Sequence, residues 1–306
     1  MKLYILGNGF DVLHGLCTRY SDFRNYLLRD SPNLLKQLGE FYDINVDSDL
    51  WKKFETSLGQ MDVSMIEKQF FEPNYASDEF SDGDYEINAL LVDNEINYVK
   101  DLKNSFIKWI NSVRFDCIMF PKLKFDKSAM FINFNYTLTL ENVYKINPKN
   151  ILHIHGQVGK EIIFGHAVDS NRWQMERMYG SGYEDIDSSM WPEIAKDYAI
   201  EQGYAALARK LDALSKKPEK NIDKCQQYIS NLKYVDEIVI LGATLSNGDE
   251  MYIRHLHQQL GNGVHEWRIY YYEEHEKSVL KNIILNCGVD EQKIVMLTSK
   301  GLEGRI

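Results

Sequence analysis

Short apolar runs, separated by longer amphipathic stretches, recur from one end of the chain to the other. In Ile238-Val239-Ile240-Leu241 the apolar side chains occupy successive positions, whereas a half-exposed strand would alternate apolar with polar residues. Such runs are typical of parallel strands that are covered on both faces. The pattern predicts strands at Lys2–Leu6, Asp116–Phe120, Met130–Phe134, Ile151–Ile154, Ile162–Phe164, Glu237–Leu241, Arg268–Tyr272 and Lys293–Leu297.

Helical periodicity appears between these runs. Apolar residues three and four positions apart form one stripe along an amphipathic helix. Three stretches show this stripe: Val99 to Val113, Ile200 to Leu214, and Ile222 to Leu232. A fourth helix around Val279–Cys287 is expected to end at Gly288, because glycine readily adopts the left-handed conformation that closes helices.

The order of these elements predicts an α/β fold. We expect a single domain over residues 1–306, with a Rossmann-like, mainly parallel sheet and helices on both faces. The stretches 31–113 and 167–233 lack most of the strand pattern and are predicted to be two helical insertions. In sheets of this kind, ligands bind beyond the carboxyl ends of the strands, so the polar residues that follow each strand are the candidates for a site.

The first strand ends in Gly7-Asn8-Gly9, followed by Phe10 and Asp11. Glycines allow backbone N–H groups to approach a ligand closely, and a helix that starts there would favour an anion such as a phosphate. The same sequence also fits an ordinary tight turn, so the motif alone does not decide between the two interpretations.

Three later strands also end in small or polar residues. Asn135 follows one strand, and it could instead cap a helix starting near Thr137. His153 and His155 would share a face of the next strand; they could ligate a metal, or one of them could be a hydrogen-bonded core residue. Ser246, in the turn after Leu241, could be a helix cap.

Composition narrows the classes of function. The 306 residues carry a net charge of −10, which argues against a broad nucleic-acid-binding surface. The four cysteines are scattered without a Cys-x-x-Cys pair, so a structural zinc module is not expected. No apolar stretch is long enough to span a bilayer, and Met1 leads directly into the first strand without a signal peptide. These features favour a cytoplasmic protein that does not act at a membrane.

Taken together, these motifs resemble those of the AbiH-like family of bacterial abortive-infection proteins. The pieces that carry the resemblance are Gly7-Asn8-Gly9-Phe10-Asp11, Thr18-Arg19-Tyr20-Ser21-Asp22-Phe23, Trp51 with Glu55, Asn135-Tyr136-Thr137 with Glu141, and His153-Ile154-His155-Gly156. The resemblance implies a role in phage defence, in which an infected cell is arrested before phage release.

The same motifs are distantly similar to those of the sirtuin fold and of sirtuin-like NAD⁺ hydrolases. The sirtuin glycine turn, its Asn motif, its His-Gly and its late Gly-x-Ser/Thr-Leu turn match Gly7 to Gly9, Asn135, His155-Gly156 and Gly242 to Leu245. This chain has Asn8 and Thr137 where sirtuins have Ala and Asp, and it lacks their zinc module. The resemblance therefore implies binding of NAD⁺ or a related nucleotide rather than deacylation.

The resemblance also implies roles for individual residues. It implies cleavage of the nicotinamide–ribose bond, with Asn135 holding the ribose and a water and His155 acting as general base or ribose partner. Contacts to the nucleotide are expected from Gly7, Asn8, Gly9, Phe10, Asp11, Thr18, Asp22, Phe23, Tyr136, Gly156, Gly242, Thr244 and Ser246. A nucleotide sensor without turnover is the alternative. Expected partners are the nucleotide and either a second copy of the chain or a phage-derived trigger.

Overall fold

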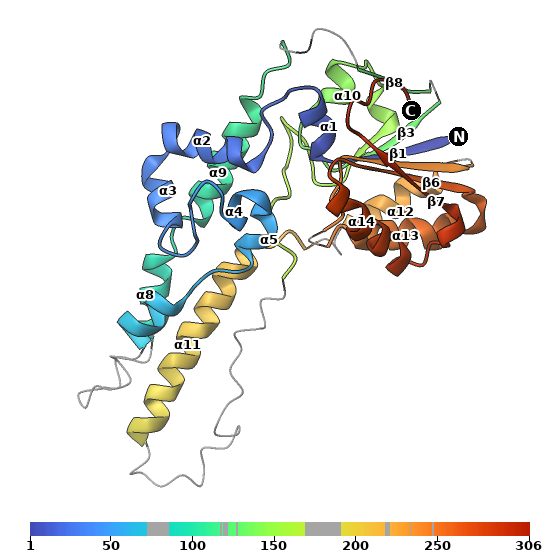
Figure 1. Cartoon of the computed structure of the whole chain (residues 1–306). Helices are drawn as coiled ribbons and strands as arrows, with labels where there is room; N and C mark the ends of the chain where they lie inside the picture. Colours follow the sequence, from blue (N-terminus) through green and yellow to red (C-terminus); the bar gives the residue numbers. More distant parts are fainter. Residues whose placement is uncertain are drawn as a thin grey trace. The chain divides into compact units, whose positions relative to one another are not determined.

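The computed structural model describes residues 1–71, 86–116, 118, 122–126, 128–168, 191–217, 221–232, 234–246 and 248–306 (Figure 1). The chain divides into two compact units. The first, here called the sheet unit, comprises Met1–Tyr26, Ser105–Phe164 and Lys216–Ile306; the second, the helical unit, comprises Leu27–Asn104 and Gly165–Ser215. The predicted organisation, one domain with insertions over 31–113 and 167–233, stays a prediction.

A six-stranded parallel sheet forms the centre of the sheet unit, which confirms the predicted fold class. Its spatial order is β4-β3-β1-β5-β6-β7. The first strand is central, pairing Leu6 with Asn133 on one side and with Leu241 on the other. The strands are β1 (Lys2–Leu6), β3 (Met130–Asn133), β4 (Ile151–His153), β5 (Glu237–Leu241), β6 (Glu266–Tyr271) and β7 (Ile294–Thr298).

This order is that of a dinucleotide-binding sheet. When the six strands are numbered by their order along the chain, their spatial order is 3-2-1-4-5-6. The side of the sheet to which successive strands are added reverses between β1 and β5. In open α/β sheets, the crevice for ligands lies at this reversal, beyond the carboxyl ends of the two strands. The turns that follow β1 and β5 are therefore where a ligand site is expected.

Both faces of the sheet are buried, as the uninterrupted apolar runs predict. Alternate residues of β1 enter two different cores: Leu3 and Ile5 pack on one face, and Tyr4 and Leu6 pack on the other. The first core is completed by α12, α13 and α14, and the second includes Phe10 from α1 and Leu140 from α10 (Figure 1). Each strand of this kind contributes side chains to two cores, which explains why its sequence does not alternate.

The helices of the sheet unit follow the predicted periodicity. The helix α14 begins with a capping box between Glu273 and Glu276 and ends just before Gly288, whose positive φ of 98° closes it as predicted. The helices are α1 (Asn8–Leu13), α10 (Thr139–Asn142), α12 (Ile222–Ser230), α13 (Glu250–Leu260) and α14 (Glu274–Asn286), with short turns η2 (Pro148–Asn150), η6 (Gly261–Gly263) and η7 (Glu291–Lys293).

One predicted strand differs from the structure. Ile162–Phe164 is not a strand: Ile162 makes an isolated bridge to Gly156, and Phe164 stacks on Phe106 with ring centroids 4.2 Å apart. The run is apolar because it packs against a helix rather than because it belongs to the sheet. The predicted strand Asp116–Phe120 lies largely outside the described residues. A small parallel pair, β2 (Leu123–Lys124) with β8 (Gly304–Arg305), was not predicted.

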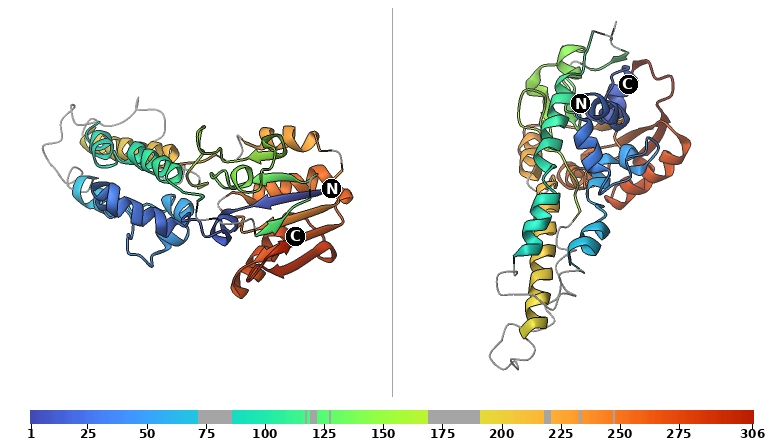
Figure 2. Two further views of the ribbon diagram at one scale, coloured as in Figure 1. Left: turned by 90° about the horizontal axis from the view of Figure 1, so that it is seen from above. Right: turned by 90° about the vertical axis from the view of Figure 1, so that its left-hand side faces the viewer.

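The helical unit is built from helices and turns. The helix α8 packs along α11, whose 23 residues make it the longest described helix (Figure 2). Among the described residues, no helix is both long and apolar enough to cross a membrane. The helices within this unit are α3 (Pro32–Leu38), α4 (Asp49–Lys52), α5 (Phe54–Leu58), α6 (Ser64–Ile66), η1 (Glu67–Phe71), α8 (Ile87–Glu95) and α11 (Trp191–Ala213), while α2 (Tyr20–Asp30) and α9 (Val99–Asn111) contain the division points.

Candidate functional site

The two glycine turns at the carboxyl edge of the sheet pack directly against each other. Gly7 N–H donates to the carbonyl of Leu241 at 3.0 Å, and Gly9 N–H donates to the carbonyl of Gly242 at 2.8 Å. A Cβ atom on Gly7 would lie 2.5 Å from the Cα of Ala243. These glycines thus permit the close approach of the β1 and β5 turns. The N–H groups of Gly7 and Gly9 are therefore both bonded within the protein.

Asn8 lies partly exposed at the start of α1, and its side-chain amide donates to the carbonyl of Thr18 at 2.8 Å. The hydroxyl of Thr18 is buried and has no hydrogen-bond partner among the described residues. Asp22 accepts a hydrogen bond from the backbone of Arg19 near the start of α2. The structure therefore brings Asn8 and Thr18 together, while Asp22 organises the following turn.

Asp11 is buried and links α1 to the segment that follows β3. Its carboxylate accepts hydrogen bonds from the hydroxyls of Thr137 and Thr139, the latter at 2.6 Å. Burial raises the pKa of Asp11 to about 6, although these two hydrogen bonds and the nearby His153 lower it. The arrangement holds the β3 turn in place, and it leaves both carboxylate oxygens bonded inside the protein.

Asn135 lies in this β3 turn with 5% of its surface exposed. Its side-chain amide donates to the carbonyl of Gly7 at 3.0 Å, joining the β3 turn to the β1 turn. The alternative role as a helix cap is wrong, since the N-cap of α10 is Leu138. Asn135 is thus placed at the centre of the carboxyl edge, beside the strand at which the order reverses.

The three candidate histidines have different surroundings. His153 bonds through both ring nitrogens, to Glu141 at 2.8 Å and to the carbonyl of Asn135 at 3.3 Å. His166 is fully buried in the helical unit, and its two nitrogens bond the backbones of Leu211 and Val168. Of His153 and His155, one of which is predicted to be a hydrogen-bonded core residue, His153 is the one bonded through both ring nitrogens.

His155 differs from the other two because only one of its ring nitrogens is paired. Its Nε2 lies 3.1 Å from the Oδ1 of Asp249, while its buried Nδ1 has no hydrogen-bond partner in the described parts of the chain. The rings of Phe134 and Tyr252 surround the imidazole, with centroids 5.3 and 6.0 Å away. A buried, unpaired nitrogen costs free energy of folding, so such an atom often marks a functional position.

An ion pair between Asp249 and the buried Lys216 supports His155. Lys216 Nζ lies 2.7 Å from the same Oδ1 of Asp249 that His155 contacts. Burial alone would raise the pKa of Asp249, but the interactions with His155 and Lys216 outweigh it and hold the pKa below its usual value. The carboxylate is therefore ionised at neutral pH and accepts from both neighbours.

The turn after β5 contributes exposed hydroxyls. Thr244 and Ser246 lie 3.0 Å apart, hydroxyl to hydroxyl, and both are exposed. Between them, Leu245 is buried and adopts a positive φ of 54°, a conformation that costs free energy for a residue with a side chain. Ser246 is not the cap of the next helix, as the alternative proposed; the N-cap of α13 is Asp249.

The remaining predicted contact residues lie deeper. Phe10 and Phe23 have no exposed surface, backbone included, and pack against aromatic rings. Tyr136 donates its hydroxyl to the carbonyl of Ile163, and Gly156 has a positive φ of 80° directly after His155. The prediction that these four contact a nucleotide stays a prediction.

Sequence reasoning did not assign roles to Asp249 and Lys216. Asp249 stands in the predicted β5 motif, and a carboxylate after a strand is the signal that could have marked it. Lys216 follows a predicted helix in a lysine-rich stretch that is typical of a solvated surface, and its burial depends on tertiary packing alone. Among the described residues, no group of three or more potential metal ligands is placed to hold an ion.

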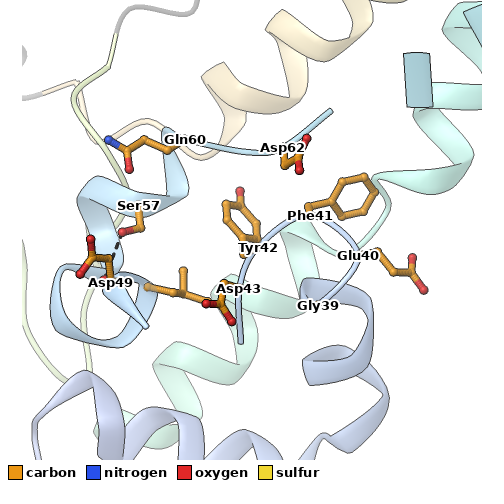
Figure 3. A pocket seen from close by; sticks show the side chains of 10 residues that line it. Gly39, Glu40, Phe41, Tyr42, Asp43, Asp49, Ser57, Gln60 and Asp62 are labelled. Carbon is orange, nitrogen blue, oxygen red and sulfur yellow. Dashed lines mark hydrogen bonds between the residues drawn. The ribbon is translucent and has the colours of Figure 1, made fainter. Parts of the chain in front are cut away.

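A separate pocket of about 600 Å³ lies within the helical unit. Figure 3 shows the side chains of Tyr42, Asp49 and Asp62 around it. The hydroxyl of Tyr42 donates to the carbonyl of Leu58, and Ser57 donates to the carbonyl of Asp49, so these groups serve the local fold. None of the predicted site residues lines this pocket.

Comparison with known proteins gives one result. The sequence model of the family described as "Bacteriophage abortive infection AbiH" matches residues 3–271. No curated protein and no solved structure matches the chain. The match covers all strands of the large sheet except β7, together with the turns that carry Asn135, His155 and Asp249. The chain therefore belongs to the bacteriophage abortive infection AbiH family.

Proposed function

We propose that the carboxyl edge of the sheet binds NAD⁺ and that the protein cleaves the nicotinamide–ribose bond during abortive infection. Family membership supports the role in abortive infection. The observation that carries the enzymatic proposal is His155, a buried imidazole with one nitrogen on a carboxylate and the other unpaired. It stands at the edge where a sheet of this strand order binds dinucleotides.

The proposed reaction passes through an oxocarbenium-like transition state, as glycoside hydrolysis does. It needs a positioned water, hydrogen bonds to the ribose hydroxyls and a site for the departing nicotinamide. In the proposal, Asn135 orients the ribose and the water. His155 accepts a proton from a ribose hydroxyl or from the water through Nδ1, because an imidazole exchanges protons readily near neutral pH. Thr244 and Ser246 offer exposed hydroxyls to the adenosine half.

The test is an assay of NAD⁺ hydrolysis by the purified protein, with nicotinamide and ADP-ribose detected by mass. We expect His155→Ala and Asn135→Ala to lose turnover about 100-fold or more, the usual contribution of a positioned acid–base group. The matched control is His275→Ala, because His275 is exposed on α14. Full turnover in both site variants, with folding unchanged, would contradict the assignment.

A binding module that senses a nucleotide without cleaving it is the second candidate. The close packing at the carboxyl edge of the sheet favours this second candidate. The Gly7 and Gly9 N–H groups are bonded to the β5 turn, and His155 Nδ1 is buried. Calorimetric titration with NAD⁺ and with ADP-ribose distinguishes the two. The sensor would be favoured if either probe binds the purified protein and NAD⁺ is cleaved neither by the purified protein nor in cells infected by phage.

A further inference from the structure

Asp249 does not perform the task that its position in the sequence favours. It is the N-cap residue of α13, where an aspartate normally accepts a hydrogen bond from the first turn of the helix. Its side chain makes no such bond and turns instead to Lys216 and His155. The helix thus gives up a stabilising capping interaction. This commitment of the carboxylate suggests a role at the candidate site.

The geometry determines which nitrogen of His155 carries hydrogen. An ionised carboxylate can only accept hydrogen bonds, so the Nε2 that faces Asp249 must bear its hydrogen. In a neutral imidazole, the other nitrogen then carries the lone pair. That other nitrogen is Nδ1, the atom without a partner among the described residues.

A second group holds the carboxylate in place. The side chain of Lys216 is 1% exposed, and its Nζ lies 2.7 Å from the same Oδ1 of Asp249 that His155 contacts at 3.1 Å. The ammonium therefore keeps the carboxylate turned toward His155, and Asp249 and Lys216 together fix the orientation of the imidazole.

We infer that Asp249 and Lys216 are positioning residues that orient His155 with hydrogen on Nε2, so that in the neutral imidazole the lone pair lies on Nδ1. This inference deepens the proposed function and rests on it. In this tautomer, the ligand group that contacts His155 Nδ1 must donate a hydrogen bond. A ribose hydroxyl does so, whereas the carbonyl oxygen of nicotinamide and the oxygens of a phosphate diester cannot. The site therefore favours a ligand that presents a hydrogen-bond donor, such as a ribose hydroxyl, to Nδ1.

The test reads the tautomer directly. In protein labelled with ¹⁵N-histidine, long-range proton–nitrogen spectra distinguish the two neutral tautomers and the imidazolium, and His155→Gln identifies the signal. We expect hydrogen on Nε2 at pH 7.5 in the unmodified protein. Asp249→Asn should convert this signal to a mixture of tautomers, because an amide can either donate or accept. Exposed Asp223 on α12 provides the matched control, Asp223→Asn, which should leave the signal unchanged.

A second variant keeps the inference testable if Asp249→Asn does not fold. In Lys216→Met, the carboxylate loses the ammonium that keeps it turned toward His155, so the His155 signal should become a mixture of tautomers. Lys224→Met, on the exposed face of α12, is the control. Hydrogen on Nδ1 in the unmodified protein, or an unchanged His155 signal in Lys216→Met, would overturn the inference.

The spectra do not depend on turnover, so the two proposals can fail separately. If NAD⁺ is cleaved, Asp249→Asn should lower kcat about 100-fold with little change in KM, because it affects the protonation of the base rather than binding. The expected tautomer together with no cleavage under any condition would refute the enzymatic proposal and leave the role of Asp249 and Lys216 standing.

Discussion

Replacement of Asp11 by asparagine should change how the stability of the protein depends on pH. Asp11 is 1% exposed, and burial raises its pKa from 3.8 to about 6. The folded state therefore binds a proton more tightly at this residue than the unfolded state does. Stability from this residue is fully present below pH 3.8 and is lost as the pH rises through 6.

The magnitude follows from the same pair of values. A pKa raised from 3.8 to about 6 corresponds to about 3 kcal/mol of stability lost between strongly acidic and neutral solution. Nearly half of this, about 1.4 kcal/mol, falls between pH 5 and pH 7.5. An asparagine does not ionise and can bond Thr137 and Thr139 with its amide oxygen and nitrogen. The free energy of unfolding of Asp11→Asn minus that of the unmodified protein should thus rise by about 1.4 kcal/mol from pH 5 to pH 7.5.

Urea unfolding, followed by circular dichroism at the two pH values, measures this difference. Asp62→Asn is the control that should show no change between these pH values, since hydrogen bonds from Ser64 lower the pKa of Asp62 below 3.8 and its stabilising effect is lost only at lower pH. A difference between Asp11→Asn and the unmodified protein that stays the same at pH 5 and pH 7.5 would refute the reasoning. So would a difference that falls over this interval.

Two further substitutions test the packing of the sheet. Gly242→Ala should lower the free energy of unfolding in urea by about 3 kcal/mol or more, because its Cβ would press on the backbone of the first turn at a positive φ. Gly301→Ala, at a similar φ in open space, should lower it by only about 1–2 kcal/mol. Equal losses in the two variants would contradict the close-approach argument. Tyr228→Phe should cost about 1 kcal/mol, because the hydroxyl joins the backbones of β3 and η2, whereas Tyr234→Phe at an exposed position should cost less; equal losses there would show that the buried hydroxyl contributes nothing.

The sequence predicts the central sheet well because its information is local. A run such as Ile238 to Leu241 is apolar at every position only if both faces of the strand are buried. The glycine and polar residues after the strands likewise point to the carboxyl edge without knowledge of the strand order. Ile162–Phe164 misleads for the same reason, since an apolar run records burial and not the partner that causes it.

The chemistry of the candidate site is less readable because it depends on contacts between distant segments. Nothing near Lys216 in the sequence distinguishes it from its neighbour Lys217, yet it is buried on Asp249. The pattern of His153 and His155 is symmetric in the sequence, and only the positions of Glu141 and Asp249 separate their roles. The two glycine turns are similarly understood only when β1 and β5 are seen side by side.

The central place of β1 has a consequence for synthesis of the protein. Its two neighbours are β3, near residue 130, and β5, near residue 240. The first strand to leave the ribosome therefore cannot pair until these later segments have been translated. Contacts of such long range slow folding, and domains of this size form partly structured intermediates. A chain released before Leu241 would expose one edge of β1 and lack the β5 turn, Asp249 and therefore the partner of His155. The candidate site is therefore complete only after most of the chain has been translated.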